Sequence, residues 1–536
     1  MPSRLLLTKI VATLGPATDT QEAVEKLIRH GARVFRLNFS HGSLDEAGER
    51  LERVRAASAA VGVPVGVLGD LSGPKIRVEQ VRDTDMDDDG DPRGLMLEVG
   101  DVVAFVRSGK ETFRRPDGVI EIGTTYPEMV DEVEIGHRVL INDGAIRLVT
   151  LGRTKRDGDG AWIEPTESSE DPGADADGLE CRVTVGGRLT HRKGVNLPDT
   201  KVGAPSLTDW DRECAAWAAE HGVDFLALSF VRRAADIDDL NDFLIERGRD
   251  NRAAHSRTRL PVIAKIEKPQ AVDELDEILR VTDGVMVARG DLGVEMDLAE
   301  VPVLQKRIVQ MAHERCRPVI VATQMLESMI QSASPTRAEV SDVANAILEG
   351  ADATMLSGET AVGKHPTLCV ATMSKTSRAA EVYLAESGRR PSERPLPRID
   401  PRQSAAPLSG QPDDSAERIA GMARAVAALV GDLNPKHVAI WSQQGGAARY
   451  LSYMRLRRPI LAFSSDLAAV RRMSLLYGVY PVHMERPDSS AAFREALDNW
   501  LKTEKLAEPH DRVILMVGTP IGDAGVTNQI EVHRVG

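Results

Sequence analysis

Cysteine is scarce in this sequence, and the few cysteines are far apart. The 536 residues include four, and no two of them form a CxxC pair. The sequence therefore indicates neither a disulfide framework nor a zinc knuckle. A reducing, cytoplasmic location is expected. The four are Cys181, Cys214, Cys316 and Cys369.

Aromatic residues, long apolar runs and excess positive charge are also missing. Aromatics make up only 4% of the chain, so its core must be largely aliphatic. No apolar run reaches the ~18 residues that a membrane-spanning helix needs, so we expect no membrane partner. Lys and Arg total 67 against 81 Asp and Glu, a formal net charge of −14 that argues against nucleic-acid binding. Any anionic small substrate must meet positive charge gathered locally.

The sequence does contain recurring short apolar runs, each followed by a helical pattern such as 20–32 or 301–316. Runs of Val, Ile, Leu and Ala without polar alternation are typical of strands buried on both faces of a parallel sheet. The eight runs cover 9–15, 34–40, 65–73, 224–231, 261–267, 284–293, 318–326 and 353–361. Eight β-α units predict an α/β protein with a (β/α)₈ TIM barrel, and a doubly wound sheet is the alternative.

The β-α rhythm stops between about 74 and 195, where short alternating runs and Gly-rich turns predict a β-rich lid domain inserted after the third strand. Removing it leaves 1–73 and 196–388, close to the ~250 residues of one barrel. Residues 389–413 are rich in Pro, Ser and charge and predict a linker. Residues 414–536 predict a smaller C-terminal α/β domain, with strands at 437–442, 459–465, 479–484 and 512–518.

Polar residues gather where the predicted barrel strands end. That end of a barrel carries the active site, because the βα loops converge there. Arg36, Asn38 and Ser40 are spaced by two and so share one face of their strand. The other strand ends carry Asp70, Lys265, Glu267, Arg289, Gly290, Asp291, Thr323, Ser357 and Glu359.

This set of side chains suits phosphoryl chemistry at a metal site. Glu267 and Asp291 are oxygen ligands of the kind that Mg²⁺ or Mn²⁺ prefers. Arg36 and Lys265 could hold and neutralise a phosphoryl group. The amides of Gly290 and Asp291 could bind a carboxylate if a helix begins there. The alternative is a ring of satisfied salt bridges at the barrel rim, which is less favoured because polar residues recur at so many strand ends.

At these residues the sequence resembles the pyruvate kinase family over nearly its whole length. The matching segments are KIVATLGPAT (9–18), RLNFSHG (36–42), DLSGPKIR (70–77), KGVNLP (193–198), LSFVR (228–232), IAKIEKP (263–269), VARGDLGVE (287–295), ATQMLESM (322–329), the long segment 335–366 and TNQIEVHRVG (527–536). The resemblance implies transfer of the phosphoryl group of phosphoenolpyruvate to ADP, giving pyruvate and ATP in the last step of glycolysis.

The resemblance also implies roles for single residues. Lys265 matches the catalytic lysine that stabilises the transition state, and Glu267 and Asp291 match the Mg²⁺ ligands. The matches to substrate contacts are Arg36, Lys265, Gly290, Asp291 and Thr323, of which Thr323 sits near the carbon that must be protonated. Asn38, Arg77 and Lys193 match nucleotide contacts. The family is usually homotetrameric.

Two rival functions are weaker. A carbon–carbon lyase of phosphoenolpyruvate chemistry would share the metal pair but would lack a lid with Arg77 and Lys193. A catalytically silent family member acting as a metabolite sensor would be expected to lose the catalytic set first, and here Arg36, Lys265 and Thr323 are all present.

The chain departs from the family pattern at the monovalent-cation site. Asn38, Ser40 and Asp70 match K⁺ ligands, but the usual Thr is Leu71. Lys75 stands where K⁺-dependent members carry Glu, and its ammonium could replace the ion. We expect activity without K⁺; a solvated Lys75 is the alternative.

A second departure lies in the C-terminal domain, which resembles the family's effector domain. Its phosphate-binding loop is usually rich in Ser and Thr but here reads SQQGGA at 442–447. The loss of two hydroxyls predicts weak or absent activation by fructose 1,6-bisphosphate. Residues 85–90 match the start of an EF-hand, but Met96 holds the twelfth position, so a solvated acidic insertion is favoured.

Overall fold

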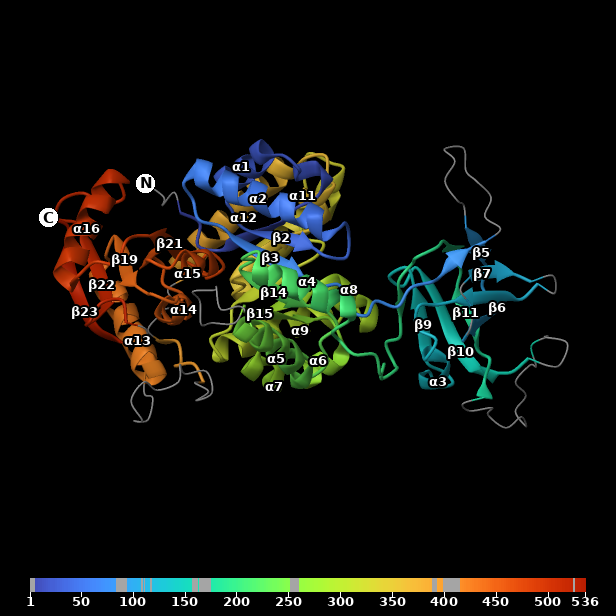
Figure 1. The fold of residues 1–536 in the computed structure, drawn as a ribbon. Coiled ribbons are helices and arrows are strands. Elements are labelled where there is room, and N and C mark those ends of the chain that lie inside the picture. The colour runs from blue at the N-terminus through green and yellow to red at the C-terminus, as the bar shows by residue number, and fades with distance from the viewer. Residues whose placement is uncertain are drawn as a thin grey trace.

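The eight short apolar runs form a closed parallel barrel in the computed structural model (Figure 1). The structure describes residues 5–82, 94–107, 109, 111–115, 118–156, 162, 175–250, 260–387, 393–398, 415–523 and 526–536. Around the barrel the strands run in the order β1-β18-β17-β16-β15-β14-β3-β2, and β1 pairs with both β18 and β2. The strands are β1 (Lys9–Thr13), β2 (Ala32–Asn38), β3 (Gly66–Asp70), β14 (Phe225–Leu228), β15 (Val262–Ile266), β16 (Gly284–Ala288), β17 (Val319–Ala322) and β18 (Ala353–Leu356).

The predicted barrel is thus confirmed, with most strands shorter than the apolar runs that predicted them. The runs 284–293 and 353–361 leave the sheet at Ala288 and Leu356 and turn directly into short helices. Apolar composition alone does not mark that turn, because the first residues of both helices are small or partly buried.

Helices surround the barrel and connect its strands. They are α1 (Gln21–His30), α2 (Leu44–Val61), α4 (Asp209–Glu220), α5 (Ala234–Asp250), α6 (Pro269–Asp273), α7 (Leu275–Val281), α8 (Arg289–Glu295), α9 (Val301–Glu314), α10 (Arg337–Glu349), α11 (Gly358–Ala361) and α12 (Pro366–Glu386), with short 3-10 turns η1 (Pro16–Thr18) and η3 (Glu327–Ile330). Helix α1 shows how the sequence sets their limits. The Thr20 side chain accepts the Ala23 N–H, and Gly31, at φ 124°, ends the helix.

The barrel strands are buried on both faces, as their composition predicted. Inside the barrel, Val11, Val34, Leu68, Ile263 and Met286 belong to one apolar cluster. That cluster also includes Leu475 from the C-terminal domain, so the third domain contributes to the barrel interior.

A β-rich domain is inserted between β3 and α4. Its strands are β4 (Gln80–Val81), β5 (Leu95–Leu97), β6 (Val102–Val106), β7 (Glu111–Arg114), β8 (Ile120–Gly123), β9 (Arg138–Ile141), β10 (Ile146–Thr154), β11 (Gly178–Val185), β12 (Gly187–Leu189) and β13 (Val195–Asn196), with one helical turn, α3 (Met129–Glu132). Eight of them form a sheet in the order β13-β9-β10-β11-β6-β8-β7-β4, and β12 pairs with β5. The EF-hand-like stretch at 85–90 lies outside the described residues.

The C-terminal domain is a five-stranded sheet with helices. Its elements are α13 (Ser415–Leu433), β19 (His437–Trp441), α14 (Gly446–Tyr453), β20 (Ile460–Ser464), α15 (Leu467–Met473), β21 (Val479–His483), α16 (Ser490–Thr503), β22 (Arg512–Gly518) and β23 (Thr527–Arg534). The sheet order is β21-β20-β19-β22-β23. The four predicted strands are present. The fifth, β23, pairs antiparallel with β22; its mixed exposed and buried residues hid it in the sequence.

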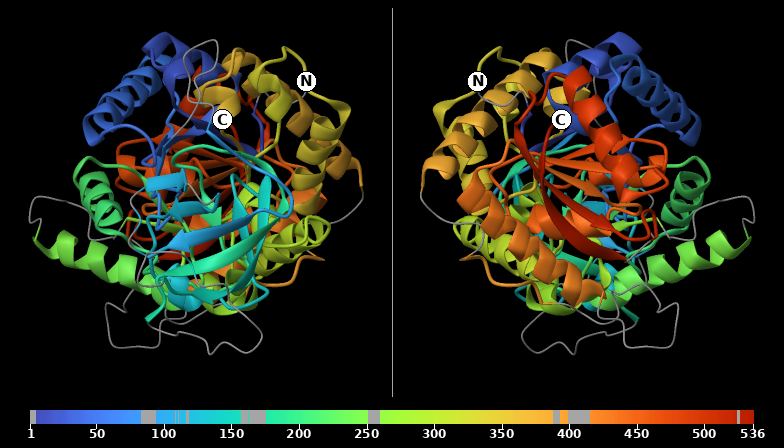
Figure 2. Two further views of the ribbon diagram at one scale, coloured as in Figure 1. Left: turned by 90° about the vertical axis from the view of Figure 1, so that its right-hand side faces the viewer. Right: turned by 90° about the vertical axis from the view of Figure 1, so that its left-hand side faces the viewer.

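The three domains lie in a row, with the barrel between the inserted and C-terminal domains (Figures 1 and 2). Of the predicted linker at 389–413, the structure describes only 393–398. There Arg394 Nη2 lies 2.8 Å from His313 Nδ1, and the Tyr453 hydroxyl donates to the Pro395 carbonyl at 2.9 Å. Across the described residues no helix is both long and apolar enough to cross a membrane.

Candidate active site

The carboxyl ends of β2 and β3 bring a buried arginine–aspartate pair together. Arg36 Nε donates to Asp70 Oδ2 at 2.6 Å, and Arg36 Nη1 donates to the Thr13 hydroxyl at 3.3 Å. Asp70 is only 1% exposed. Burial works to raise the pKa of Asp70, but the cations of Lys265 and Arg36 outweigh it and hold that pKa below its usual value. The aspartate is therefore a fixed negative charge.

Lys265, on β15, lies at the centre of the polar cluster. Its Nζ donates to Ser229 Oγ at 2.6 Å and lies 3.4 Å from Asp70 Oδ1 and 3.5 Å from Glu267 Oε2. Burial alone would lower the pKa of this amine, yet Asp70, Glu267 and Asp291 together raise it. Lys265 is therefore a permanent, desolvated cation, which suits it to stabilise a developing negative charge.

Ser229 is a site residue that the sequence analysis missed. It follows β14 and is 2% exposed, and its hydroxyl donates to the Leu71 carbonyl at 2.6 Å while accepting from Lys265. The available signal was its position in the LSFVR segment at the end of the fourth barrel strand. A serine there carries no charge, so it did not stand out among the strand-end residues.

Glu267 and Asp291 form a site that fits a divalent cation. Glu267 Oε1 accepts the Phe230 N–H at 2.5 Å, whereas the buried Oε2 has no hydrogen-bond partner. Burial chiefly raises the pKa of Glu267 to about 7; Lys265 opposes this shift and Asp291 adds to it. A divalent cation would relieve the repulsion between the two carboxylates and would coordinate the Oε2 atom, which has an ion-pair neighbour in Lys265 but no hydrogen bond.

The number of protein ligands also suits magnesium. No group of three or more His, Cys, Asp or Glu side chains able to hold a metal occurs in the described parts of the chain. Magnesium is usually held by one or two carboxylates, with water and substrate phosphate oxygens completing its shell. Glu267 and Asp291 match that pattern, whereas a calcium or structural zinc site would need more protein ligands.

Gly290 and Thr323 lie in direct contact between the start of α8 and the end of β17. The Gly290 N–H donates to Thr323 Oγ1 at 2.7 Å, and the Thr323 hydroxyl donates to the Ala322 carbonyl at 2.7 Å. A Cβ atom at Gly290 would lie 3.3 Å from Thr323 Oγ1, tighter than most contacts. Glycine therefore permits the close approach of this amide and hydroxyl.

The predicted nucleotide contacts lie in two places. The Asn38 side-chain oxygen accepts the Ser40 N–H at 3.2 Å near the barrel cluster, where Ser40 is exposed. Arg77 lies at the joint of the inserted domain, where its backbone forms an antiparallel β-bridge with Gly194. Its Nη1 donates to the Arg192 carbonyl at 3.0 Å. Lys193 is on the facing segment, and its carbonyl accepts the Val78 N–H at 2.8 Å.

Lys75 lies in the same joint, half-buried. A Cβ atom at Gly194 would lie 2.9 Å from Lys75 Cε, so the glycine leaves room for the lysine stem. None of the ion pairs among the described residues involves Lys75. The ammonium is therefore a positive charge without a bound carboxylate.

Glu359 does not join the polar cluster, contrary to what its strand-end position suggested. Its carboxylate is fully buried, and it accepts the Leu326 N–H at 3.0 Å and the Ser357 N–H at 2.7 Å. It therefore ties together the two loops that follow β17 and β18. Spacing in the sequence cannot tell a carboxylate that faces backbone amides from one that faces the active site.

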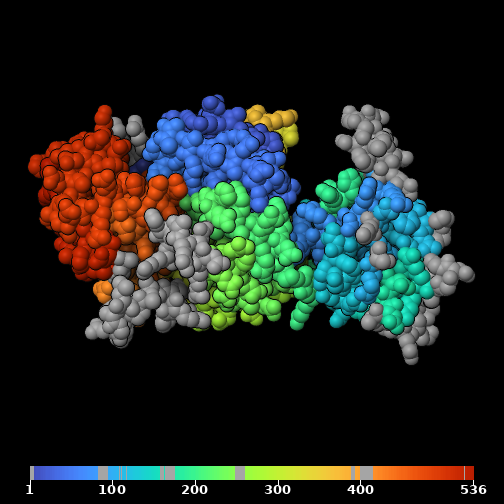
Figure 3. Space-filling model, in the orientation of Figure 1, coloured from blue at the N-terminus to red at the C-terminus, as the bar shows by residue number. Residues whose placement is uncertain are grey.

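A cleft of about 880 Å³ separates the inserted domain from the barrel beside this site. Arg138, Arg147 and Thr184 line it from the inserted domain, and Arg289, Gly290 and Gln324 line it from the barrel. Figure 3 shows the surface hollowed between these two domains. The cleft is large enough for a bound small molecule to lie against the barrel cluster.

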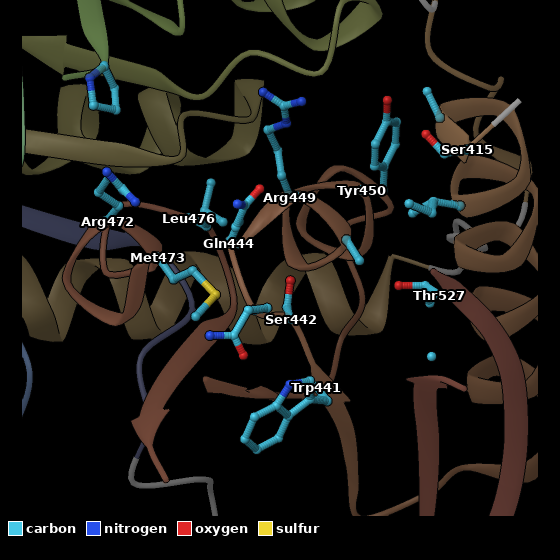
Figure 4. Close-up of a pocket in the computed structure, with 18 of the residues that line it drawn as sticks. Ser415, Trp441, Ser442, Gln444, Arg449, Tyr450, Arg472, Met473, Leu476 and Thr527 are labelled. Atoms are coloured by element: carbon cyan, nitrogen blue, oxygen red, sulfur yellow. The ribbon is translucent and has the colours of Figure 1, made fainter. Parts of the chain in front are cut away.

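A second cavity, of about 480 Å³, lies where the C-terminal domain meets the barrel. The SQQGGA loop lines it, and Figure 4 shows Gln444, Arg449 and Tyr450 around it. Two polar side chains of that loop are already engaged. Ser442 Oγ accepts the Ala448 N–H at 3.3 Å, and Gln443 Nε2 donates to Ser465 Oγ at 2.9 Å.

Comparison with known proteins agrees with this geometry. The family model "Pyruvate kinase, barrel domain" matches residues 5–162 and 168–370, and "Pyruvate kinase, alpha/beta domain" matches 420–533. Pyruvate kinases from Mycobacterium intracellulare and Mycobacterium tuberculosis H37Rv are each 38% identical to this chain, with 98% of both chains covered. A crystal structure of a pyruvate kinase from Cryptosporidium parvum matches with TM-score 0.81 and 28% identity, covering 99% of this chain and 96% of that one. The resemblance found in the sequence motifs is confirmed, and the chain belongs to the pyruvate kinase family.

Proposed function

We propose that this protein is an active pyruvate kinase that transfers the phosphoryl group of phosphoenolpyruvate to ADP. The observation that carries the proposal is the desolvated Lys265 ammonium, held by Ser229 between Asp70 and Glu267. A phosphoryl transfer needs little covalent help from the protein and much fixed positive charge. The site supplies that charge from Lys265 and Arg36.

The reaction divides into two steps. An oxygen of the ADP β-phosphate attacks phosphorus, the bond from phosphorus to the enol oxygen breaks, and its electron pair leaves as the enolate of pyruvate. The enolate carbon then takes one proton to give pyruvate. Lys265 neutralises charge in the first step, and Arg36 orients the phosphoryl group.

Thr323 and the amides of Gly290 and Asp291 serve the substrate carboxylate and the second step. A carboxylate that takes the Gly290 N–H would displace the Thr323 hydroxyl from it, because that hydroxyl is now the acceptor at 2.7 Å. The freed hydroxyl then faces the substrate, where it orients the proton-delivering group. Substrate binding and placement of Thr323 are thereby coupled.

Magnesium is the cofactor we propose, held by Glu267 and Asp291. When bound, it would supply positive charge that offsets the negative charge developing on the phosphoryl group and the enolate. The Glu267 Oε2 atom, which accepts no hydrogen bond, supports this assignment, and Mn²⁺ would fit the same ligands. Asn38, Arg77 and Lys193 are assigned to ADP, with the inserted domain closing as a lid that excludes water.

The proposal also covers the response of the enzyme to K⁺ and to fructose 1,6-bisphosphate, its location and its oligomeric state. Lys75 replaces K⁺ as a fixed positive charge, and this role is supported by its ammonium, which has no ion-pair partner among the described residues. The SQQGGA loop responds weakly or not at all to fructose 1,6-bisphosphate, because two of its side chains bond within the protein. The enzyme works in the cytoplasm as a homotetramer, as is usual in the family.

The testing experiment measures pyruvate formation from phosphoenolpyruvate, ADP and Mg²⁺, with and without K⁺. The matched control is Lys265→Met, which keeps the length of the side chain and removes its charge. We expect turnover that is independent of K⁺ and absent in the control. Turnover that requires K⁺ would remove the role of Lys75, and no turnover from the folded protein would overturn the function. A large left shift of the phosphoenolpyruvate curve on adding the bisphosphate would contradict the regulatory assignment.

A further inference from the structure

Arg289, the first residue of α8, binds the backbone that carries Thr323. Its Nη2 donates to the Thr323 carbonyl at 2.8 Å, and its Nε donates to the preceding Ala322 carbonyl at 3.3 Å. The same Nη2 lies 2.8 Å from Met325 Sδ. One guanidinium thus contacts three of the four residues from Ala322 to Met325, around the turn that follows β17.

That turn has an unusual conformation. Thr323 and Gln324 both have positive φ, at 69° and 54°. Two consecutive non-glycine residues in the left-handed region are rare, and the β-branched Thr323 is especially disfavoured there. Such a conformation persists only where surrounding contacts hold it, and Arg289 supplies those contacts at the carbonyls of the turn.

Arg289 is itself held from outside the active site. Its Nη1 donates to Asp342 Oδ1 at 2.7 Å, and Asp342 lies on α10. The Arg289 side chain is 12% exposed and that of Asp342 is 36% exposed. The planar guanidinium can reach two carbonyls and a carboxylate at once, which a lysine ammonium cannot do with the same geometry.

The hydroxyl of Thr323 remains free to turn while its backbone is held. It bonds to Gly290 and to its neighbouring carbonyl, and neither bond involves Arg289. The position of the Thr323 backbone and the torsion of its side chain are therefore controlled separately. The backbone is fixed by Arg289, and only the side-chain torsion changes when a substrate carboxylate takes the Gly290 amide.

We propose that Arg289, oriented by Asp342, is a positioning residue for the proton-transfer step, because it holds the strained turn that presents Thr323 to the enolate carbon. This inference rests on the proposed function. It assigns to the pair a role in the second step of the reaction and none in phosphoryl transfer, since the bonds of the two side chains go to the turn at Thr323 and to each other, and none goes to Lys265, Arg36 or Glu267.

The test compares the two steps in the same protein. Phosphoryl transfer is measured as ATP formed from phosphoenolpyruvate and ADP. Proton transfer is measured separately, by NMR, as the exchange of pyruvate methyl protons with D₂O in the presence of Mg²⁺ and ATP. The first variant is Asp342→Ala, because Asp342 lies on the surface of α10 and away from the reacting atoms. Arg289→Lys is the second variant, which keeps the charge and loses the planar fork.

The chain offers a closely matched control in Asp276→Ala. Arg315 Nη2 bonds Asp276 Oδ1 at 2.6 Å, and their side chains are 7% and 40% exposed. This pair is buried to nearly the same degree as Arg289–Asp342, and Asp276 also accepts from Arg280, so its loss removes at least as many bonds. It links α7 to the segment before β17, at the opposite end of that strand. Thermal unfolding of all variants reports any general loss of structure.

We expect Asp342→Ala and Arg289→Lys to slow methyl-proton exchange at least tenfold more than they slow phosphoryl transfer, with the Asp276→Ala ratio unchanged. An equal loss in both steps would reduce the pair to a structural role and overturn the inference. So would exchange at the wild-type rate. Absence of turnover in the wild-type protein is a different result, which overturns the proposed function itself.

Discussion

At the scale of single residues, Ser229 connects Lys265, the proposed catalytic lysine, to the strand that carries Asp70. Its hydroxyl both accepts from Lys265 and donates to Leu71, each at 2.6 Å. A hydrogen bond to a charged group is worth about 1.5–3 kcal/mol. Without it, Lys265 would be held only by Asp70 and Glu267, at 3.4 and 3.5 Å.

We expect Ser229→Ala to lower kcat about tenfold, which corresponds to ~1.4 kcal/mol, while changing the phosphoenolpyruvate KM little. Steady-state kinetics checks the split between kcat and KM. Ser377→Ala is the matched control, because Ser377 is also fully buried and its hydroxyl has no hydrogen-bond partner. A loss confined to KM would show that Ser229 acts on binding rather than on the position of Lys265.

At the scale of elements, hydrophobic pattern revealed the barrel and concealed smaller features. The eight barrel strands were found because they are buried on both faces, which removes polar residues from both sides of each strand. The inserted domain was predicted only as a β-rich region. Strands β4, β12 and β13 have two or three residues each, which is too short to show the alternation of apolar and polar residues. Helix α8 was hidden because Arg289 and Gly290 have no helical pattern of their own.

The polar cluster could be predicted because strand ends converge in a barrel, whatever the side-chain contacts are. The contacts themselves could not be predicted from the sequence. Glu359 follows its strand closely, as Glu267 does, yet faces backbone amides, while Ser229 faces Lys265. The difference lies in the paths of the loops after β14, β17 and β18, which local residue patterns do not encode.

Glu339 holds the start of α10, the helix that carries Asp342. Glu339 accepts from the Thr336 N–H and hydroxyl and from the Ser328 N–H and hydroxyl, at 2.6–2.9 Å. It therefore ties the helix start to η3. We expect Glu339→Ala to lower the free energy of unfolding by about 2 kcal/mol, against ~1 kcal/mol for Thr20→Ala, which removes a single cap at α1. Urea denaturation of both variants checks the order, and equal losses would contradict it.

At the scale of the whole molecule, a buried charged cluster joins the C-terminal domain to the barrel. Arg455, which follows α14, bonds the Gly350 carbonyl and lies 3.1 Å from Asp352 Oδ1. Its guanidinium also stacks on the Tyr477 ring at 4.1 Å. His313, on α9, lies between Arg455, Asp352 and Arg394, so one imidazole contacts the barrel, the 393–398 segment and the C-terminal domain.

This cluster makes the docked state sensitive to acid. Burial first, and the Arg455 cation next, lower the pKa of His313 to about 4, although Asp352 opposes the shift. The unfolded chain would bind a proton at the ordinary pKa of about 6.5, so the unfolded state carries more protons between pH 6.5 and 4. Stability is therefore highest above pH 6.5 and falls as the pH drops toward 4, by roughly 3 kcal/mol from this one group.

We expect His313→Gln to remove that part of the acid sensitivity. Glutamine can still donate or accept a hydrogen bond but does not titrate, so the variant should lose less stability than the wild type between pH 6.5 and 4. The measurement is the free energy of unfolding from urea titrations at several pH values. The difference at pH 8, where histidine is neutral in both states, gives the packing cost to subtract. Parallel curves for the two proteins below pH 6.5 would show that His313 titrates normally and that the interface is not held by a neutral imidazole.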